Sequence, residues 1–276
     1  MMKELLDKIL YYPLPWRLAF FRKLRRIKNK ISLNPYKERL DEDEVDRPHY
    51  GYCIYNAAKL AKALGHSKIS IIELGVAGGN GLVNIEYHIK EIQKEIDIDF
   101  EVYGFDNETG LPKSNDYRDC LYAWNEGYFK MDKEKLESKL KISKLVIGDV
   151  NETCSTFFQK YKPAPIGCVL VDLDYYSSTM NAFKIFEADS SNYLPRVLCY
   201  FDDVLGLNEY LGELAAIHEF NKKFEYKKIA KIYAFQFFRK YKKAWNEQIF
   251  CFHDFKHPQY NTSIKKKPNS FTELND

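Results

Sequence analysis

Residues 68–81, KISIIELGVAGGNG, decide the fold of this chain. The first half is a continuous apolar run, typical of a buried strand, and the second is a glycine-rich turn that leads into a helical pattern. The spacing differs from a dinucleotide fingerprint, because Ala77 and Asn80 stand at positions where that fingerprint needs glycine. Glu73, two residues before Gly75, favours a nucleoside without a pyrophosphate. Strand-to-helix packing is the alternative explanation for the glycines.

Similar apolar runs recur along the chain and alternate with helical patterns. Four of them read as buried strands: FEVYGFD (100–106), KLVIGDV (144–150), GCVLVDLD (167–174) and RVLCYFDDV (196–204). Helices are expected near 51–65, 80–96, 132–142, 152–161, 178–188 and 208–224, and a closing antiparallel pair at 228–238 and 247–253. This alternation predicts a mainly parallel sheet covered by helices on both faces. Ligands of such sheets bind at the carboxyl ends of the strands.

The composition is that of a globular protein of 276 residues, with 45% hydrophobic residues and a net charge of +3. This balance excludes collagen-like and wholly disordered classes, and it does not call for nucleic acid as a partner. Six cysteines without a C-x-x-C pair are typical of structural thiols in a reducing compartment. No apolar run is long enough for a membrane span, and no signal peptide is recognisable. We expect a cytoplasmic protein.

The two ends of the chain differ from its middle. Residues 1–30 carry nine Lys/Arg, and an apolar stripe follows helical spacing within 16–28. Such a helix could lie peripherally on the inner membrane surface, or pack on the main domain or across a dimer interface, and packing is favoured. The predicted division is a basic amphipathic helix with a solvated acidic linker at 1–46, a main domain at 47–258 and a flexible tail at 259–276.

Acidic residues end the second and third predicted strands. Asp106 could accept hydrogen bonds from both hydroxyls of a ribose, and a turn or helix cap is the alternative. Asp149 could meet an adenine amino group, but it is at least as well placed to cap the helix that begins near Asn151.

The fourth and fifth strands end in four aspartates: Asp172, Asp174, Asp202 and Asp203. Carboxylates so close together repel one another unless a cation or a proton intervenes. Oxygen ligands from adjacent strand ends suit Mg²⁺, Mn²⁺ or Ca²⁺. Each acid could instead cap the helix that follows it, but uncompensated acids at an apolar strand end are costly, so the metal interpretation is favoured.

These stretches, in this order, resemble a known family. The chain resembles class I S-adenosylmethionine-dependent methyltransferases, and more narrowly the macrocin O-methyltransferase (TylF-like) sugar O-methyltransferases. The stretches that carry the resemblance are ELGVAGG, the acid of GFDNETGLP, GDVNET, VDLDYYSST and YFDDV. The resemblance covers about residues 47–255. Leu173 replaces a glycine that the family usually has, and Val204 replaces a tyrosine. It implies a Rossmann-like α/β fold with a seven-stranded sheet, mainly parallel, and an antiparallel closing strand.

The resemblance also implies a role for each strand end. The S-adenosyl-L-methionine site would be shaped by Glu73, Gly75 and Gly79. The ribose of this cofactor would be bound by Asp106 and its adenine by Asp149. The metal, Mg²⁺ or Mn²⁺, would be held by Asp172, Asp202 and Asp203. Asp172 is the first candidate for the catalytic base and Asp174 the second. The expected reaction is methyl transfer to a sugar hydroxyl of a glycan or a glycosylated small molecule.

Other assignments remain open from the sequence. Arg47, His49, Tyr50 and Tyr52 precede the first helix of the main domain, where relatives place a lid, although loop aromatics usually only pack. The basic and aromatic stretch 222–243 would suit an RNA methyltransferase, but no N/D-P-P-Y/F stretch is present. A catechol-like small-molecule O-methyltransferase and a non-enzymatic scaffold are further alternatives. We expect a homo-oligomer with a small-molecule or glycan acceptor and no nucleic-acid partner.

Overall fold

The computed structural model describes residues 34–205 and 208–262. The amphipathic helix predicted within 1–30 and most of the predicted C-terminal tail lie outside these residues. Among the helices of the described ranges, none combines the length and the apolar character that crossing a bilayer requires.

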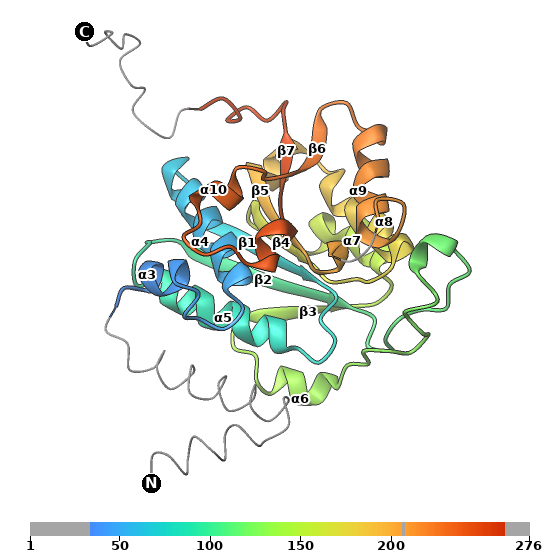
Figure 1. Cartoon of the computed structure of the whole chain (residues 1–276). Coiled ribbons are helices and arrows are strands. Elements are labelled where there is room, and N and C mark those ends of the chain that lie inside the picture. Colours follow the sequence, from blue (N-terminus) through green and yellow to red (C-terminus); the bar gives the residue numbers. More distant parts are fainter. Residues whose placement is uncertain (1–33, 206–207, 263–276) are drawn as a thin grey trace, which may run out of the picture.

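A seven-stranded sheet forms the centre of the molecule (Figure 1). Its strands are β1 Lys68–Leu74, β2 Asp99–Asp106, β3 Ser143–Ile147, β4 Ile166–Val171, β5 Tyr193–Phe201, β6 Lys227–Lys231 and β7 Ile249–Asp254. The order is β3-β2-β1-β4-β5-β7-β6, and β7 runs antiparallel to both of its neighbours. The five predicted parallel strands and the antiparallel closing strand are therefore confirmed. Strands β1 and β4 are buried almost throughout, which explains why they read as continuous apolar runs.

Helices cover both faces of the sheet (Figure 1). One face carries α3 Tyr36–Asp41, α4 Pro48–Ala63 and α5 Asn80–Ile92, and the other carries α7 Val150–Tyr161, α8 Tyr176–Ala182 and α9 Gly212–Lys223. Two short helices, α6 Lys133–Glu137 and α10 Phe235–Phe238, lie in connections, as do 3₁₀ helices at Tyr117–Asp119, Phe183–Phe186, Ser190–Asn192, Asp202–Val204 and Ala244–Gln248. Each face has its own apolar core, and alternate residues of a strand point into opposite cores, as Ile71 and Ile72 do. All six cysteines are buried and free.

Two local predictions are wrong. The acidic segment after α3 is not a solvated linker: Val45 is fully buried, and Asp43 forms an ion pair with the buried guanidinium of Arg239. The stretch 228–238 is not a strand to its end, because β6 stops at Lys231, opposite the first residues of β7. The chain beyond it turns into α10.

Candidate active site at the carboxyl edge of the sheet

A cavity of about 310 Å³ opens where the first five strands end. Because β1 to β5 are parallel, the residues that follow them meet at one edge of the sheet. Its walls include Gly75 and Ala77 after β1, Asp106 and Asn107 after β2, Asp149 and Val150 after β3, Asp172, Leu173 and Asp174 after β4, and Asp202 and Asp203 after β5. The acids that the sequence predicted at the ends of β2, β3, β4 and β5 thus share one cavity.

Asp106 is held in place by the glycine-rich turn. Its Oδ2 accepts hydrogen bonds from the backbone N–H groups of Val76 and Ala77, at 3.0 and 2.8 Å, and its Oδ1 accepts one from Glu108 at 2.7 Å. Gly75 adopts φ +84°, and a Cβ there would lie 1.8 Å from the carbonyl oxygen of Asp172. The turn therefore needs glycine to pack against the end of β4.

Glu73 and Gly79 lie behind the cavity and are absent from its lining. Glu73 is 2% exposed, and Tyr50 Oη donates to its Oε1 at 3.0 Å. Burial raises the pKa of Glu73 to about 8 against the opposing effect of Tyr50 and Arg47, so a protonated carboxyl is favoured at neutral pH. Gly79 caps α5 with φ +78°, against Leu136. Both residues support the turn from below.

Asp149 is both a helix cap and a residue of the cavity wall. It is the N-cap of α7, and its Oδ1 accepts from Asn151 N at 2.8 Å. It also lines the cavity. The cap leaves carboxylate lone pairs available to a ligand, because each oxygen can accept more than one hydrogen bond.

Three of the four aspartates form a tight cluster. Asp172, Asp174 and Asp203 each offer a carboxylate oxygen, and these oxygens lie within 4.8 Å of one another. Asp174 does not cap α8, whose N-cap is Tyr175; it adopts φ +56°, and its N–H donates to Asp203 Oδ2 at 3.1 Å. Burial first, then repulsion from neighbouring aspartates, Asp202 among them, raises the pKa of Asp172 to about 7, of Asp174 to about 8 and of Asp203 to about 6. Three carboxyl groups so close together cannot all ionise easily unless a cation neutralises them. Their oxygen atoms are ligands that suit a hard divalent cation.

Asp202 lies on the cavity wall but outside this cluster. It is exposed, and its Oδ1 accepts a hydrogen bond from Tyr200 Oη at 2.5 Å. Gln248 fixes its backbone by donating from Nε2 to the Asp202 carbonyl oxygen at 2.7 Å. The cluster thus contains Asp174 where the sequence had placed Asp202.

Glu213 is a residue of the site that sequence reasoning missed. It is fully buried at the start of α9, where Oε1 accepts from Leu173 N at 3.4 Å and Oε2 from Asp203 N at 3.1 Å. One carboxyl therefore joins the ends of β4 and β5. Burial raises its pKa well above the ordinary range, and Asp203 adds to the effect. The available signal was an acid on the apolar helical face of Ile217 and Phe220.

Of the four residues expected before the first helix, Arg47 caps α4 and the other three lie in its first turns, and they divide into two kinds. The Arg47 guanidinium lies 5.1 Å from the ring centre of Tyr50, and although burial opposes its charge, Tyr50, Glu73 and Asp172 raise its pKa. It therefore places positive charge beside the acids. His49 stacks on Tyr200 at 4.4 Å, and burial lowers its pKa to about 3, so it is neutral. Tyr52 packs edge-on against a phenylalanine of α10.

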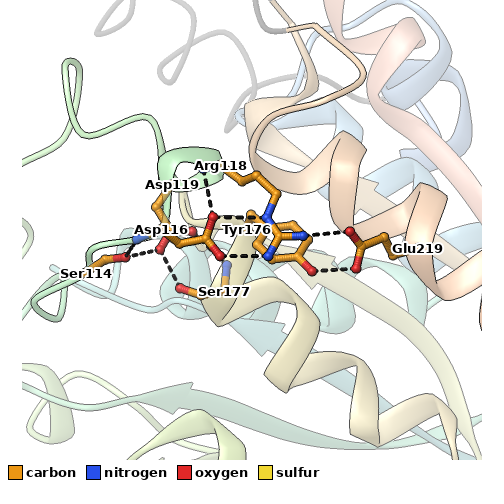
Figure 2. Close-up of polar contacts among 7 residues, drawn as sticks. All are labelled: Ser114, Asp116, Arg118, Asp119, Tyr176, Ser177 and Glu219. Carbon is orange, nitrogen blue, oxygen red and sulfur yellow. Dashed lines mark hydrogen bonds and ion pairs between the residues drawn. The ribbon is translucent and has the colours of Figure 1, made fainter.

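The segment between β2 and α6 closes one side of the cavity with Trp124 and Phe129. Figure 2 shows how it is fastened to α8 and α9. Buried Asp119 accepts from Ser177 N at 2.8 Å and Ser177 Oγ at 2.6 Å. The Arg118 guanidinium lies 3.7 Å from the ring centre of Tyr176, and it pairs with Asp116 at 2.8 Å and with Glu219 at 2.7 Å. The segment is thus anchored by charged hydrogen bonds and does not depend on apolar packing alone.

Comparisons with known proteins bear on the fold. No protein-family model and no curated protein matches the sequence. Solved structures do match, among them the O-methyltransferase NovP (TM-score 0.50, 15% identity, covering 67% of this chain and 76% of that chain). The calicheamicin methyltransferase CalS11 (0.48, 20%, 76% and 86%) and the O-methyltransferase TomG from Streptomyces achromogenes (0.42, 13%, 75% and 78%) also match. With the strand order, the likeness to NovP confirms the Rossmann-like class I methyltransferase fold.

Proposed function

We propose that this protein is an S-adenosylmethionine-dependent, divalent-metal-dependent O-methyltransferase whose acceptor is a sugar hydroxyl of a glycan or a glycosylated small molecule. The observation that supports this most is that one cavity joins Asp106, the acid suited to a ribose, to the cluster of Asp172, Asp174 and Asp203. NovP, whose fold this chain shares, is an O-methyltransferase. The sugar acceptor rests on the sequence resemblance.

Residues after β1, β2 and β3 would bind the nucleoside. Asp106 is already oriented by three backbone N–H groups, and its remaining lone pairs can accept the ribose hydroxyls. Asp149 would accept from the adenine amino group while it caps α7. Phe105 and Leu111 supply apolar walls for the base.

Residues after β4 and β5 would activate the acceptor. Asp172, Asp174 and Asp203 would hold Mg²⁺ or Mn²⁺, and Asp202 stands beside them on the wall. When bound, the cation supplies charge that lowers the pKa of an acceptor hydroxyl, and the cofactor supplies an electrophilic methyl group. Asp172, or Asp174 as second candidate, would accept the hydroxyl proton, and the benefit of the cation would come mostly from acidifying that hydroxyl.

The segment after β2 would hold the acceptor in place. Trp124 lines the cavity, and its buried Nε1 has no hydrogen-bond partner among the described residues. A sugar oxygen would give this N–H an acceptor, which supports an oxygen-rich substrate. With Phe129 it would also exclude water and keep the reacting atoms within reach of each other.

The cofactor is tested by calorimetric titration of S-adenosylhomocysteine into the full chain. We expect binding that Asp106→Ala weakens by about tenfold or more, because ribose hydroxyls lose a charged acceptor. Glu126→Ala, an exposed acid in the segment after β2, is the matched control and should bind normally. No heat at several temperatures from a folded protein would refute methyl transfer.

The metal is tested by titrating Mn²⁺ into the same protein. Asp203→Asn should weaken binding by at least about tenfold, whereas Asp202→Asn should have a smaller effect, because Asp202 lies outside the cluster. Equal loss in both variants would restore the set of Asp172, Asp202 and Asp203. No Mn²⁺ binding at all would leave a metal-independent transferase. Acceptor screening with and without EDTA would then follow.

A further inference from the structure

The connection between β6 and β7 exposes an unusual amount of aromatic surface. Phe237 and Phe238 are 85% and 83% exposed, and Tyr233 is 74% exposed. Because β6 is parallel to β5, this connection leaves the sheet at the same edge as the cavity. Eleven of the fifteen exposed large apolar side chains of the described residues lie within 107–132, 202–211 and 232–248, the stretches that leave β2, β5 and β6 at this edge, so the edge concentrates the apolar surface.

These rings project from a fixed base. Phe235 is 2% exposed and packs edge-on against Tyr52, with ring centres 4.5 Å apart, and against Trp245 at 5.5 Å. Arg239 is 8% exposed, lies 4.7 Å from the Trp245 ring and forms an ion pair with Asp43. Inward anchors therefore stand on both sides of Phe237 and Phe238 in the chain, and α10, which carries the two exposed rings, lies beside α4 (Figure 1).

The surroundings of the rings are basic. Residues 226–246 contain seven Lys/Arg and no acid. Four of the seven are used inside the protein: Lys227 and Lys228 donate to backbone carbonyls, Lys231 pairs with Glu247, and Arg239 pairs with Asp43. Lys240, Lys242 and Lys243 remain exposed next to the rings; Lys240 pairs with Glu42, and Lys242 and Lys243 have no ion-pair partner among the described residues.

We propose that this aromatic and basic surface, residues 233–243, docks on an anionic lipid bilayer. Adjacent phenylalanines on a fixed projection can enter the boundary between headgroups and acyl chains, where tyrosines also lie well. Lysines beside them are attracted to anionic headgroups. Nucleic acid fits less well, because binding to it needs a track of free cations, and this chain turns four of its seven inward. A second copy of the chain would bring like charges together.

Docking in this way places the cavity near the membrane. Both features belong to the carboxyl edge of the sheet, and a contact path joins them: Trp245 lies 6.3 Å from His49, which stacks on Tyr200, which donates to Asp202 on the cavity wall. A docked molecule therefore presents its cavity to groups attached to lipids. The docking does not depend on the proposed methyl transfer, because it requires neither cofactor nor acceptor.

The test is sedimentation of the full chain with vesicles of phosphatidylcholine, with and without phosphatidylglycerol. We expect anionic vesicles to bind, and Phe237→Ser/Phe238→Ser to lower the partition coefficient by about tenfold or more. Lys242→Glu/Lys243→Glu should lower it by a similar factor, and added salt should do the same. The control is Tyr226→Ser/Phe255→Ser, which removes two exposed rings at the opposite edge and should leave binding unchanged.

Three results would overturn the proposal. The first is vesicle binding that both loop variants leave intact but that deletion of residues 1–33 abolishes. The second is an absence of vesicle binding while the loop substitutions abolish binding of an RNA oligonucleotide. The third is a dimer, observed by analytical ultracentrifugation without vesicle binding, that Phe237→Ser/Phe238→Ser dissociates. Each would assign the surface to a different partner or to none.

Discussion

Gly81 owes its identity to the carboxyl group beneath it. A Cβ at this position would lie 1.7 Å from Glu73 Oε1, so the first turn of α5 passes directly over the buried acid. Alanine in place of glycine usually stabilises a helix. Here we expect Gly81→Ala to lower the free energy of unfolding by about 1–3 kcal/mol, through overpacking. Urea denaturation measures this.

Two further variants make the cause of that loss explicit. Gly78→Ala, three residues earlier, has open space around its Cβ and should change stability by less than about 0.5 kcal/mol. In a Glu73→Ala background, Gly81→Ala should cost little, because the colliding oxygen has gone. A full cost in that background would show that the helix backbone, and not Glu73, requires the glycine.

Glu213 fixes the backbone of Leu173 and Asp203, next to the acid cluster, through two hydrogen bonds. Glutamine can accept only one of the two N–H groups that Glu213 satisfies, so we expect Glu213→Gln to destabilise the fold by about 1–3 kcal/mol. The ends of β4 and β5 would then be less well aligned, and Mn²⁺ affinity should fall by about tenfold. Glu209→Gln, an exposed acid of the same connection, serves as control. Unchanged Mn²⁺ affinity in a destabilised Glu213→Gln protein would limit this residue to folding.

The positions of the strand ends were enough to predict from the sequence which acids meet in the cavity. Asp106, Asp149 and Asp172 follow apolar runs, and parallel strands bring such positions together whatever their distance in the chain. Two details were beyond it. Asp174 belongs to the cluster and has a left-handed backbone, φ +56°. No sequence pattern predicts a left-handed conformation at this aspartate. Glu213 reaches the site across helix packing, which periodicity does not locate.

Buried Asp119 fastens the segment between β2 and α6 to the first turn of α8. Asp119→Ala would leave the N–H and Oγ of Ser177 without an acceptor and would free Ser114. We expect the segment to open more often and limited proteolysis within residues 107–132 to be at least about tenfold faster. Glu126→Ala, exposed in the same segment, should be cleaved at the native rate. Equal rates for both variants would mean that the remaining contacts suffice.

Helices and strands were predicted well where the burial of one or both of their faces determined the hydrophobic pattern of the sequence. Strands β1, β4 and β5 are buried almost throughout, so their apolar runs marked them within a few residues. The run 228–238 misled because the residues beyond Lys231, IYAFQFF, are almost all apolar although no partner strand is there: Lys231 pairs with Phe250, almost at the start of β7. The acidic stretch after α3 misled because its partner, Arg239, is some two hundred residues away.

The buried acids make the stability of the whole molecule depend on pH. The pKa values of Glu73, Asp172, Asp174 and Asp203 are all raised, to about 8, 7, 8 and 6. Between about pH 4.5 and about pH 8 the folded protein therefore holds protons that the unfolded chain has released, and stability falls as the pH rises. In EDTA we expect the free energy of unfolding to drop by about 2 kcal/mol or more across this window.

A divalent cation should flatten this dependence. Mg²⁺ held by the proposed cluster would need deprotonated carboxylates of the folded state, so it should stabilise most at the upper end of the window. Urea denaturation at several pH values, with and without Mg²⁺, measures the difference. Asp174→Asn/Asp203→Asn should remove the Mg²⁺ effect. Parallel pH profiles with and without Mg²⁺ in the unsubstituted protein would contradict a cation at this cluster.

The position of β7 sets the order in which the sheet can be completed. It is the last strand of the chain, yet it lies between β5 and β6. During synthesis, β5 must therefore keep an open edge, and β6 has no strand to join, until residue 254 has left the ribosome. An unpaired apolar edge is a site of aggregation. A chain that terminates before Ile249 would keep every acid of the cavity and still be unable to close its sheet, so we expect premature termination there to yield aggregates and not a smaller enzyme.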